Sequence, residues 1–140
     1  MTRAEDWRAE RTRAAAEHAA RLEARQAAEH AEAAEFIERF VERARAARLP
    51  AEPLRVQGYG GRGSARTPFT GWYLRRDRRA ALGEEGDFYV LTAPLSVLDR
   101  IRGVRPEPVP APLVLGQGGK DGESIDLVDA LERLLPGWRG

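Results

Sequence analysis

The sequence contains no cysteine, no asparagine and only one lysine, Lys120, among its 23 basic residues. The absence of cysteine excludes disulfide scaffolds, zinc fingers, iron–sulfur sites and thiol catalysis. Lysine and asparagine have A/T-rich codons, whereas arginine and alanine have G/C-rich ones. The surplus of arginine therefore indicates a G/C-rich genome rather than phosphate binding.

Long apolar runs are missing as well. No stretch approaches the roughly 20 apolar residues that span a bilayer, and residues 1–21 lack the apolar core of a signal peptide. The 140 residues fit one domain of ordinary size, and their formal charge of +1 gives no whole-chain attraction to nucleic acid or to an anionic membrane. We therefore expect a soluble, cytoplasmic protein without a membrane partner.

Catalytic and metal-binding groups are scarce. The only histidines, His18 and His30, lie twelve residues apart, which on a helix separates them by about 120° around the axis. They cannot face one metal ion, and no histidine is left for a Ser–His arrangement elsewhere. We expect a non-enzymatic protein with no catalytic residue, no metal site and no cofactor.

One long helix is predicted at the start of the chain. From Arg3 to about Arg48 there is neither glycine nor proline, and sixteen of the first 48 residues are alanine, set among glutamate and arginine. Thr2 and Glu5 match a capping box, and Leu49-Pro50 ends the pattern. At 1.5 Å per residue this rod is about 70 Å long, so about half of it must project beyond a compact domain. Two pairs on it have the i,i+4 spacing of ion pairs: Glu17–Arg21 and Glu35–Arg39.

The helix carries a docking patch and a heptad seam. Its bulky apolar residues gather in the second half, at Phe36, Ile37, Phe40 and Val41, which we expect to dock on the remaining chain. Small and apolar residues recur upstream and through this patch at spacings of 3, 4 and 7: Ala16, Ala20, Ala27, Ala31, Ala34, Ile37, Val41 and Ala44.

A seam of alanines allows a second helix to approach closely. Trp7, far from the docking patch, also favours a partner because a large exposed aromatic side chain is unusual on a projecting helix. We interpret Trp7, Ala16, Ala20, Ala27, Ala31 and Ala34 as self-association residues of a homo-oligomer, such as a dimer, or of a complex with a helical protein partner. The pairing would be antiparallel or bundled. The alternative is a solvated helix on which alanine falls on every face.

The remaining chain predicts a small antiparallel sheet. Strands are expected at 54–57, 69–76, 80–83 and 88–92, with a hairpin turn at 84–87 and a further strand at 113–115. The alternating prolines at 106, 108, 110 and 112 predict an extended connector along an edge or surface, with recognition of a partner as the alternative.

Two shorter helices are predicted after the hairpin. The first covers Leu95–Arg102, with Ser96 near its start, Gly103 at its end and Leu95, Leu98 and Ile101 on its buried side. The second covers Ile125–Leu135, capped by Ser124, and its apolar stripe is expected in the core. The fold class is therefore α+β: a long N-terminal helix, a sheet of four to five strands, and a short and a C-terminal helix packed on it. Residues 1–35 form the projecting helix and residues 36–140 the single domain.

Two glycine-rich loops invite comparison with phosphate-binding motifs. Residues 58–63 match G-x-G-x-x-G, but a strand is expected after them, where a dinucleotide site needs a helix. Residues 116–124 do precede a helix but lack the P-loop spacing. An anion site at Gly118, Gly119, Lys120 and Ser124 is one interpretation, and a tight turn with a helix cap is the other.

The neutral total charge hides a polarised domain. Residues 55–79 hold seven arginines against Asp77 alone, whereas residues 80–140 carry a net charge of −4. Interleaved aromatic residues (Tyr59, Phe69, Trp72 and Tyr73) could stack on bases while the arginines follow a phosphate backbone. The nucleic-acid-binding candidates are Arg55, Arg62, Arg66, Arg75, Arg76 and Arg78. The alternative is that the rings lie in the core and the two charged regions neutralise each other.

Three motifs resemble those of a group of small actinobacterial proteins of uncharacterised function. The motifs are W-Y-L-R-R-D at residues 72–77, F-Y-V-L at residues 88–91 and G-G-K-D-G-E-S at residues 118–124. The similarity covers roughly residues 36–135. It implies no activity, so three functions remain in order: self-association through the projecting helix, nucleic-acid binding by region 55–79, and anion binding at residues 116–124.

Overall fold

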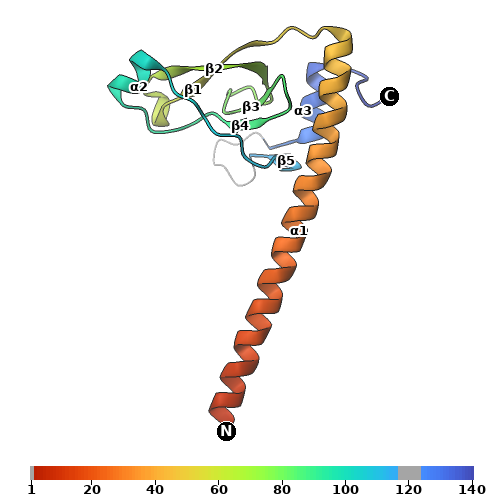
Figure 1. Ribbon diagram of the computed structural model, residues 1–140, viewed down its shortest axis with the longest axis vertical. Helices are drawn as coiled ribbons and strands as arrows, with labels where there is room; N and C mark the ends of the chain where they lie inside the picture. Colours follow the sequence, from red (N-terminus) through yellow and green to blue (C-terminus); the bar gives the residue numbers. More distant parts are fainter. Residues whose placement is uncertain (1, 117–123) are drawn as a thin grey trace.

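The computed structural model describes residues 2–116 and 124–140, and it confirms the α+β class. Helix α1 runs unbroken from Arg3 to Ala47 (Figure 1). The Thr2 hydroxyl accepts a hydrogen bond from the Glu5 amide, and the Glu5 carboxylate accepts one from the Thr2 amide, so the predicted capping box is present. Arg48 ends the helix in the left-handed conformation, two residues before Pro50.

The helix docks on the body by its second half only, as expected (Figure 1). Its buried residues are Ala33, Ile37, Phe40, Val41 and Ala44, whereas every residue from Arg3 to Ala28 is exposed. The exposed part is about 39 Å long at 1.5 Å per residue. Neither of the two predicted i,i+4 pairs is an ion pair in the structure, because their charged groups do not approach within 4 Å.

Four strands form an antiparallel sheet in the order β1-β2-β3-β4. They are β1 (Glu52–Gln57), β2 (Ser64–Tyr73), β3 (Ala80–Gly83) and β4 (Phe88–Val90). β2 begins five residues before the predicted start, because the 58–63 loop is a tight 3₁₀ turn (Tyr59–Gly61) of a β1–β2 hairpin. A strand follows this turn, as predicted.

The sheet is curled, so that the end of β1 lies beside the segment that follows β4. The Gln57 amide donates to the Leu91 carbonyl at 2.9 Å, and the Ala93 amide donates to the Gln57 carbonyl at 3.1 Å. The two faces of the curled sheet then cover two separate cores. The smaller core, inside the curl, is built from Leu54, Val56, Ala81, Tyr89 and Leu91.

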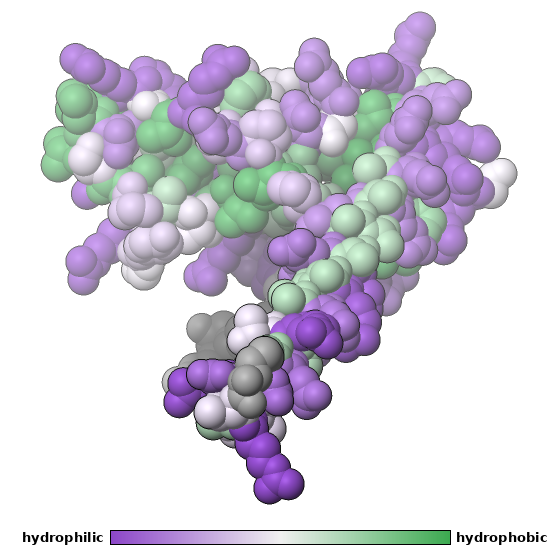
Figure 2. All heavy atoms as spheres, turned by 60° about the horizontal axis from the view of Figure 1, so that its bottom comes forward, coloured by the Kyte–Doolittle hydropathy of each residue, from purple (hydrophilic) through white to green (hydrophobic). Residues whose placement is uncertain are grey.

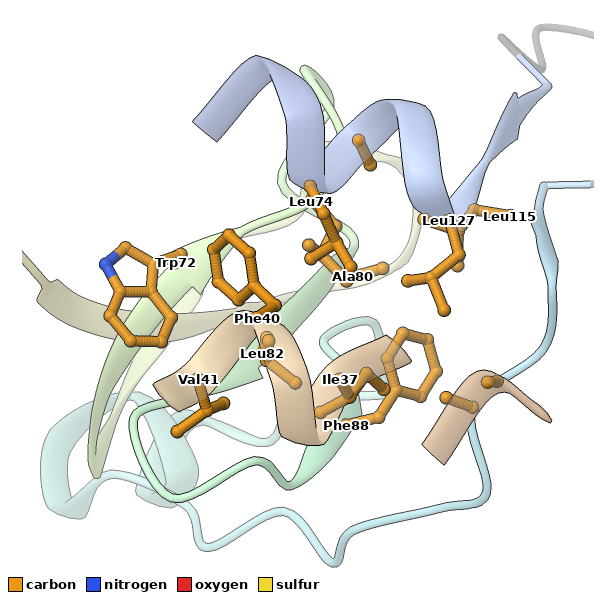
Figure 3. Close-up of a cluster of buried hydrophobic side chains, with 14 of the residues drawn as sticks. Ile37, Phe40, Val41, Trp72, Leu74, Ala80, Leu82, Phe88, Leu115 and Leu127 are labelled. Atoms are coloured by element: carbon orange, nitrogen blue, oxygen red, sulfur yellow. The ribbon is translucent and has the colours of Figure 1, made fainter. Parts of the chain in front are cut away.

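The larger core lies between the sheet and helices α1 and α3 (Figure 3). Phe40 points from α1 toward Trp72 and Leu74, and its ring meets the Trp72 ring edge to face at 5.6 Å. Trp138, near the end of the chain, belongs to the same cluster, and its ring centroid lies 6.0 Å from that of Phe40. Trp138 follows Pro136-Gly137 and belongs to no periodic element, so no sequence pattern predicted its burial.

The short helix α2 (Val97–Arg102) begins two residues after its predicted start, with a capping box at Ser96, and ends at Gly103 as predicted. Its predicted buried side is wrong. Leu95 is half-buried, but Leu98 and Ile101 are exposed. The apolar spacing identified the helix correctly, but no element within residues 2–116 and 124–140 covers that face.

The proline-rich segment is extended, as predicted, and follows the free edge of β4, where the Val109 amide donates to the Phe88 carbonyl. Strand β5 (Val114–Leu115) then pairs with β6 (Ile125–Asp126) in a separate two-stranded ribbon. The predicted cap at Ser124 is therefore wrong. Because Ile125 and Asp126 form β6, helix α3 (Leu127–Leu134) begins only after Asp126, its N-cap residue.

Candidate functional site

The alanine seam of α1 is an exposed stripe. Ala16, Ala20, Ala27, Ala31 and Ala34 fall within about 60° of arc at 3.6 residues per turn, and all five are exposed. The buried residues Ile37, Val41 and Ala44 lie on the neighbouring face and pack on the body, so they do not continue the seam. Figure 2 shows a pale green line of weakly hydrophobic surface along α1. We call these five alanines the alanine stripe.

The stripe leads into a groove where α1 meets the body. This groove has a volume of about 820 Å³ and an apolar floor that includes Ala34, Ile37 and Val41. Its rim is acidic, with Glu38 and Glu42 on α1 and residues 85–87 of the β3–β4 turn opposite; Arg45 is the basic residue on it. A helix lying on the stripe would therefore run on into the groove.

Two polar contacts fix the point where α1 leaves the body. The Glu29 carboxylate accepts a hydrogen bond from the Leu113 amide at 3.0 Å. His30 Nδ1 lies 2.8 Å from the Ala111 carbonyl oxygen, and because a carbonyl only accepts, Nδ1 carries the proton. Contact with the body thus starts at Glu29, upstream of the boundary expected at residue 36. His30 has a structural role here, and its contact positions the proline-rich segment.

Trp7 lies on another face of α1. It is roughly opposite the alanine stripe around the helix axis, with 58% of its surface exposed. The Arg11 guanidinium lies 4.5 Å above its ring. The predicted self-association residues therefore divide between two faces, and one helix–helix contact can use either the stripe or Trp7.

The fold brings only some of the six candidate nucleic-acid-binding arginines close together. The Arg55 side chain donates to Ser64 Oγ, its amide donates to the Tyr73 hydroxyl at 2.8 Å, and Arg78 lies over the Tyr73 ring. Arg66 is the cross-strand partner of Arg55. Arg55 and Arg66 therefore share one side of the sheet, Arg78 lies against Tyr73, and Arg62 is exposed on the β1–β2 turn.

The other two candidates are differently placed. Arg75 forms an ion pair with Asp77 at 2.8 Å and is mostly buried, whereas Arg76 is exposed. Burial alone would raise the pKa of the Asp77 carboxyl, but hydrogen bonds from the Arg75 side chain and the Arg79 amide, together with both charges, hold its pKa below 3.8. Arg75 is thus engaged in structure rather than free for phosphate.

The aromatic residues do not form a platform for bases. Trp72 is buried in the larger core, and Phe69 stacks on Tyr89 with ring centroids 4.9 Å apart. Tyr73 is half-buried and covered by Arg78. Of the four predicted rings, Tyr59 alone is broadly exposed. The stacking part of the nucleic-acid prediction is wrong because alternate residues of a strand face opposite sides, and both sides of this sheet are core.

The predicted anion loop falls mostly outside the described residues. Gly118, Gly119 and Lys120 are not among them, and Ser124 is exposed ahead of β6. The helix that was expected to supply amide groups at Ser124 starts at Leu127, behind an acidic N-cap residue. The helix part of this prediction is therefore wrong.

Within residues 2–116 and 124–140, no cluster of three or more His, Asp or Glu side chains is arranged to hold a metal ion. No helix in the same ranges has the length and apolar character needed to cross a membrane. Comparisons with protein-family models, curated proteins and solved structures found no match. The resemblance to the actinobacterial group stays a prediction, and the function has to be argued from the surfaces themselves.

Proposed function

We propose that the protein is a non-enzymatic self-association protein whose α1 helices pair in antiparallel orientation through the alanine stripe. The observation that carries this proposal is that α1 extends about 39 Å beyond its last contact with the body and that the five alanines of the stripe are all exposed on one face. A helix that only had to cover the sheet would need residues 29–47 and no more.

The spacing of the stripe supports the antiparallel arrangement. When two helices cross midway between Ala20 and Ala27, Ala16 faces Ala31 and Ala20 faces Ala27 of the other copy. Small residues then meet small residues in both of these pairs, and the backbones can approach closely there. In the same register, Arg13 faces Ala34 and comes close to Glu38 at the acidic groove. Parallel pairing would instead bring the two acidic grooves side by side.

The mass in solution tests the pairing. The full chain should have the mass of a dimer, with a fraction of dimer that rises with concentration, in light scattering or analytical ultracentrifugation. A double substitution in the stripe, Ala20→Glu with Ala27→Glu, should shift the protein to monomer because it places charges in a close-packed contact. The matched control is Ala14→Glu with Ala15→Glu, which adds the same charges to exposed positions away from the stripe.

The orientation can be tested by engineered disulfides, since the chain has no cysteine of its own. A mixture of Ala16→Cys and Ala31→Cys chains should cross-link under mild oxidation, because these positions face each other in the antiparallel pair. Ala16→Cys alone should not. A monomer at the highest attainable concentration would reject self-association, and efficient cross-linking of Ala16→Cys alone would show parallel pairing. A monomeric chain would leave a different helical protein as the partner of the stripe.

A further inference from the structure

Helix α2 presents an uncovered apolar face to solvent. Val97, Leu98 and Ile101 are 67%, 51% and 64% exposed. The spacing of one and four residues puts all three on one side of the helix. Fully exposed aliphatic side chains are common singly, but three adjacent ones on one rigid turn form a patch.

The patch belongs to a firmly held helix. The Ser96 and Asp99 capping box fixes its start, since the Asp99 amide donates to Ser96 Oγ and the Ser96 amide donates to the Asp99 carboxylate. Its end is tied to β2, where the Arg66 guanidinium donates to the Ile101 carbonyl at 3.1 Å and the Val104 amide donates to the Arg66 carbonyl. The helix is therefore docked through polar groups, with its apolar face left outward.

Arginines surround this face. Around the helix axis Arg100 lies on one flank and Arg102 on the other. Arg102 lines a shallow groove of about 390 Å³ together with Arg66 and Arg105. Arg100 lines a second groove, of about 480 Å³, with Arg62. No Asp or Glu lines either groove in the part of the chain that the structure describes, so the charged side chains that line them are all basic.

The patch lies at the end of the body away from α1 (Figure 1). Figure 2 shows hydrophobic surface at the same end of the body, bordered by hydrophilic surface. The patch is on an outward-facing helix, not in a groove. An exposed apolar helix face flanked by arginines has the chemistry needed to insert among the anionic headgroups of a lipid bilayer.

We propose that α2 and its surrounding arginines dock the protein on the surface of a bilayer that contains anionic lipids. The aliphatic side chains would enter the boundary between headgroups and acyl chains, and the arginines would bind the lipid phosphates. The formal charge of +1 gave no such attraction for the chain as a whole. Folding creates it by collecting Arg62, Arg66, Arg100, Arg102 and Arg105 at one end.

The chemistry of the patch favours lipid over nucleic acid. Bases are bound by stacking on aromatic rings, whereas the centre of this patch is aliphatic and Tyr59 is the exposed ring beside it. Contact with a phosphate backbone stabilises aliphatic side chains little, whereas their transfer from water to a lipid environment is favourable.

Co-sedimentation of the full chain with vesicles tests the proposal. We expect binding to phosphatidylcholine vesicles that contain about 30% phosphatidylglycerol, because anionic headgroups attract basic residues near the surface. Binding should weaken with added salt and be at least tenfold weaker on pure phosphatidylcholine. The double variant Leu98→Ser with Ile101→Ser should bind at least tenfold more weakly, and Arg62→Gln with Arg102→Gln about fivefold more weakly per arginine.

Matched controls separate the patch from general charge and hydrophobicity. Val90→Ser removes an exposed apolar side chain elsewhere, and Arg39→Gln with Arg43→Gln removes two exposed charges from α1. Neither control should change vesicle binding. Circular dichroism and thermal unfolding of each variant confirm that it is folded, since all substituted side chains are exposed.

Three results would overturn the proposal. The first is no sedimentation with the anionic vesicles at low salt, and the second is equal loss in the patch variants and their controls. The third is retardation of a nucleic acid that depends on Arg62 and Arg102 but not on Leu98 and Ile101, without vesicle binding. The proposal is independent of self-association, because the alanine-stripe variants leave α2 intact.

Discussion

The two halves of α1 have similar composition and very different surroundings. Residues 3–28 and residues 29–47 are both rich in alanine, glutamate and arginine, and both form regular helix. The second half buries five residues, whereas the first half buries none. The difference arises from bulk, because Phe36, Ile37, Phe40 and Val41 supply the area that docking needs. Helix formation and docking are thus separate properties of this chain.

Helix propensity explains why the projecting half can persist without a core. Alanine, glutamate and arginine are strong helix formers, and the docked half acts as a preformed nucleus from which the helix propagates. Docking requires apolar area instead, at roughly 25 cal/mol per Å² removed from water. The alanine stripe offers little such area, so a partner helix on it gains from close approach along many residues.

The largest expected difference between the halves comes from Phe40→Ala. Phe40 is fully buried between two tryptophans, so its truncation should lower the free energy of unfolding by about 3–5 kcal/mol. Leu22→Ala in the projecting half is the control and should change it by less than about 0.5 kcal/mol. Urea unfolding followed by tryptophan fluorescence measures both. Equal effects would show that the projecting half has a core of its own.

Glutamate substitutions at two nearby alanines should have different effects on the docked face of α1 and on the alanine stripe. Ala33 is completely buried, so Ala33→Glu should destabilise the fold by about 3 kcal/mol or more. Ala31 is exposed on the stripe, so Ala31→Glu should leave the free energy of unfolding of the monomer unchanged and weaken only self-association. Dilute urea titrations and light scattering give the two readouts. A stable Ala33→Glu variant would contradict the docked geometry.

The helix caps should show the same contrast on a smaller scale. Thr2→Ala removes the capping box of α1 at a cost of about 0.5–2 kcal/mol. Because this end is remote from the core, the loss should appear as fraying in hydrogen exchange, with no shift of the global urea midpoint. Ser96→Ala removes the equivalent box of α2, which is tied to the sheet, and should lower the midpoint. A midpoint shift in Thr2→Ala would mean that the projecting end is packed.

The smallest expected effect is the contribution of Asp77, in the body, to the pH dependence of stability. The pKa of Asp77 is lower in the folded protein than its ordinary value of 3.8. The folded state therefore favours the carboxylate, and this stabilisation is present above pH 3.8 and is lost as the pH falls through the lower folded pKa. Urea midpoints at pH 6 and pH 3 should differ less in Asp77→Asn than in the unchanged protein. An unaltered pH dependence would show that the Arg75–Asp77 pair contributes nothing.

Sequence patterns over a few residues predicted the helices and strands, but not which of their faces other elements would cover. Thr2 was identified as a helix cap because a capping box depends on residues three positions apart, whereas Ser96, the N-cap of α2, was placed only near the start of a helix expected from Leu95. Ser124 was not a cap, because Ile125 and Asp126 pair with β5. Leu98 and Ile101 have the spacing of a buried helix face, and sequence spacing says nothing about whether another element lies over it. The arginine grooves likewise join residues from three separate segments.

The sequence by itself determined the long N-terminal helix, its cap, its docking patch and the presence of four strands, although β2 begins five residues before its predicted start. Those features follow from propensity and periodicity over a few residues. The tertiary structure decided the rest: Ala33 is buried while Ala31 and Ala34 are exposed, Trp72 lies in the core, and α2 shows its apolar face to solvent. Exposure depends on which distant segment covers a side chain, and that is settled only when the whole chain packs.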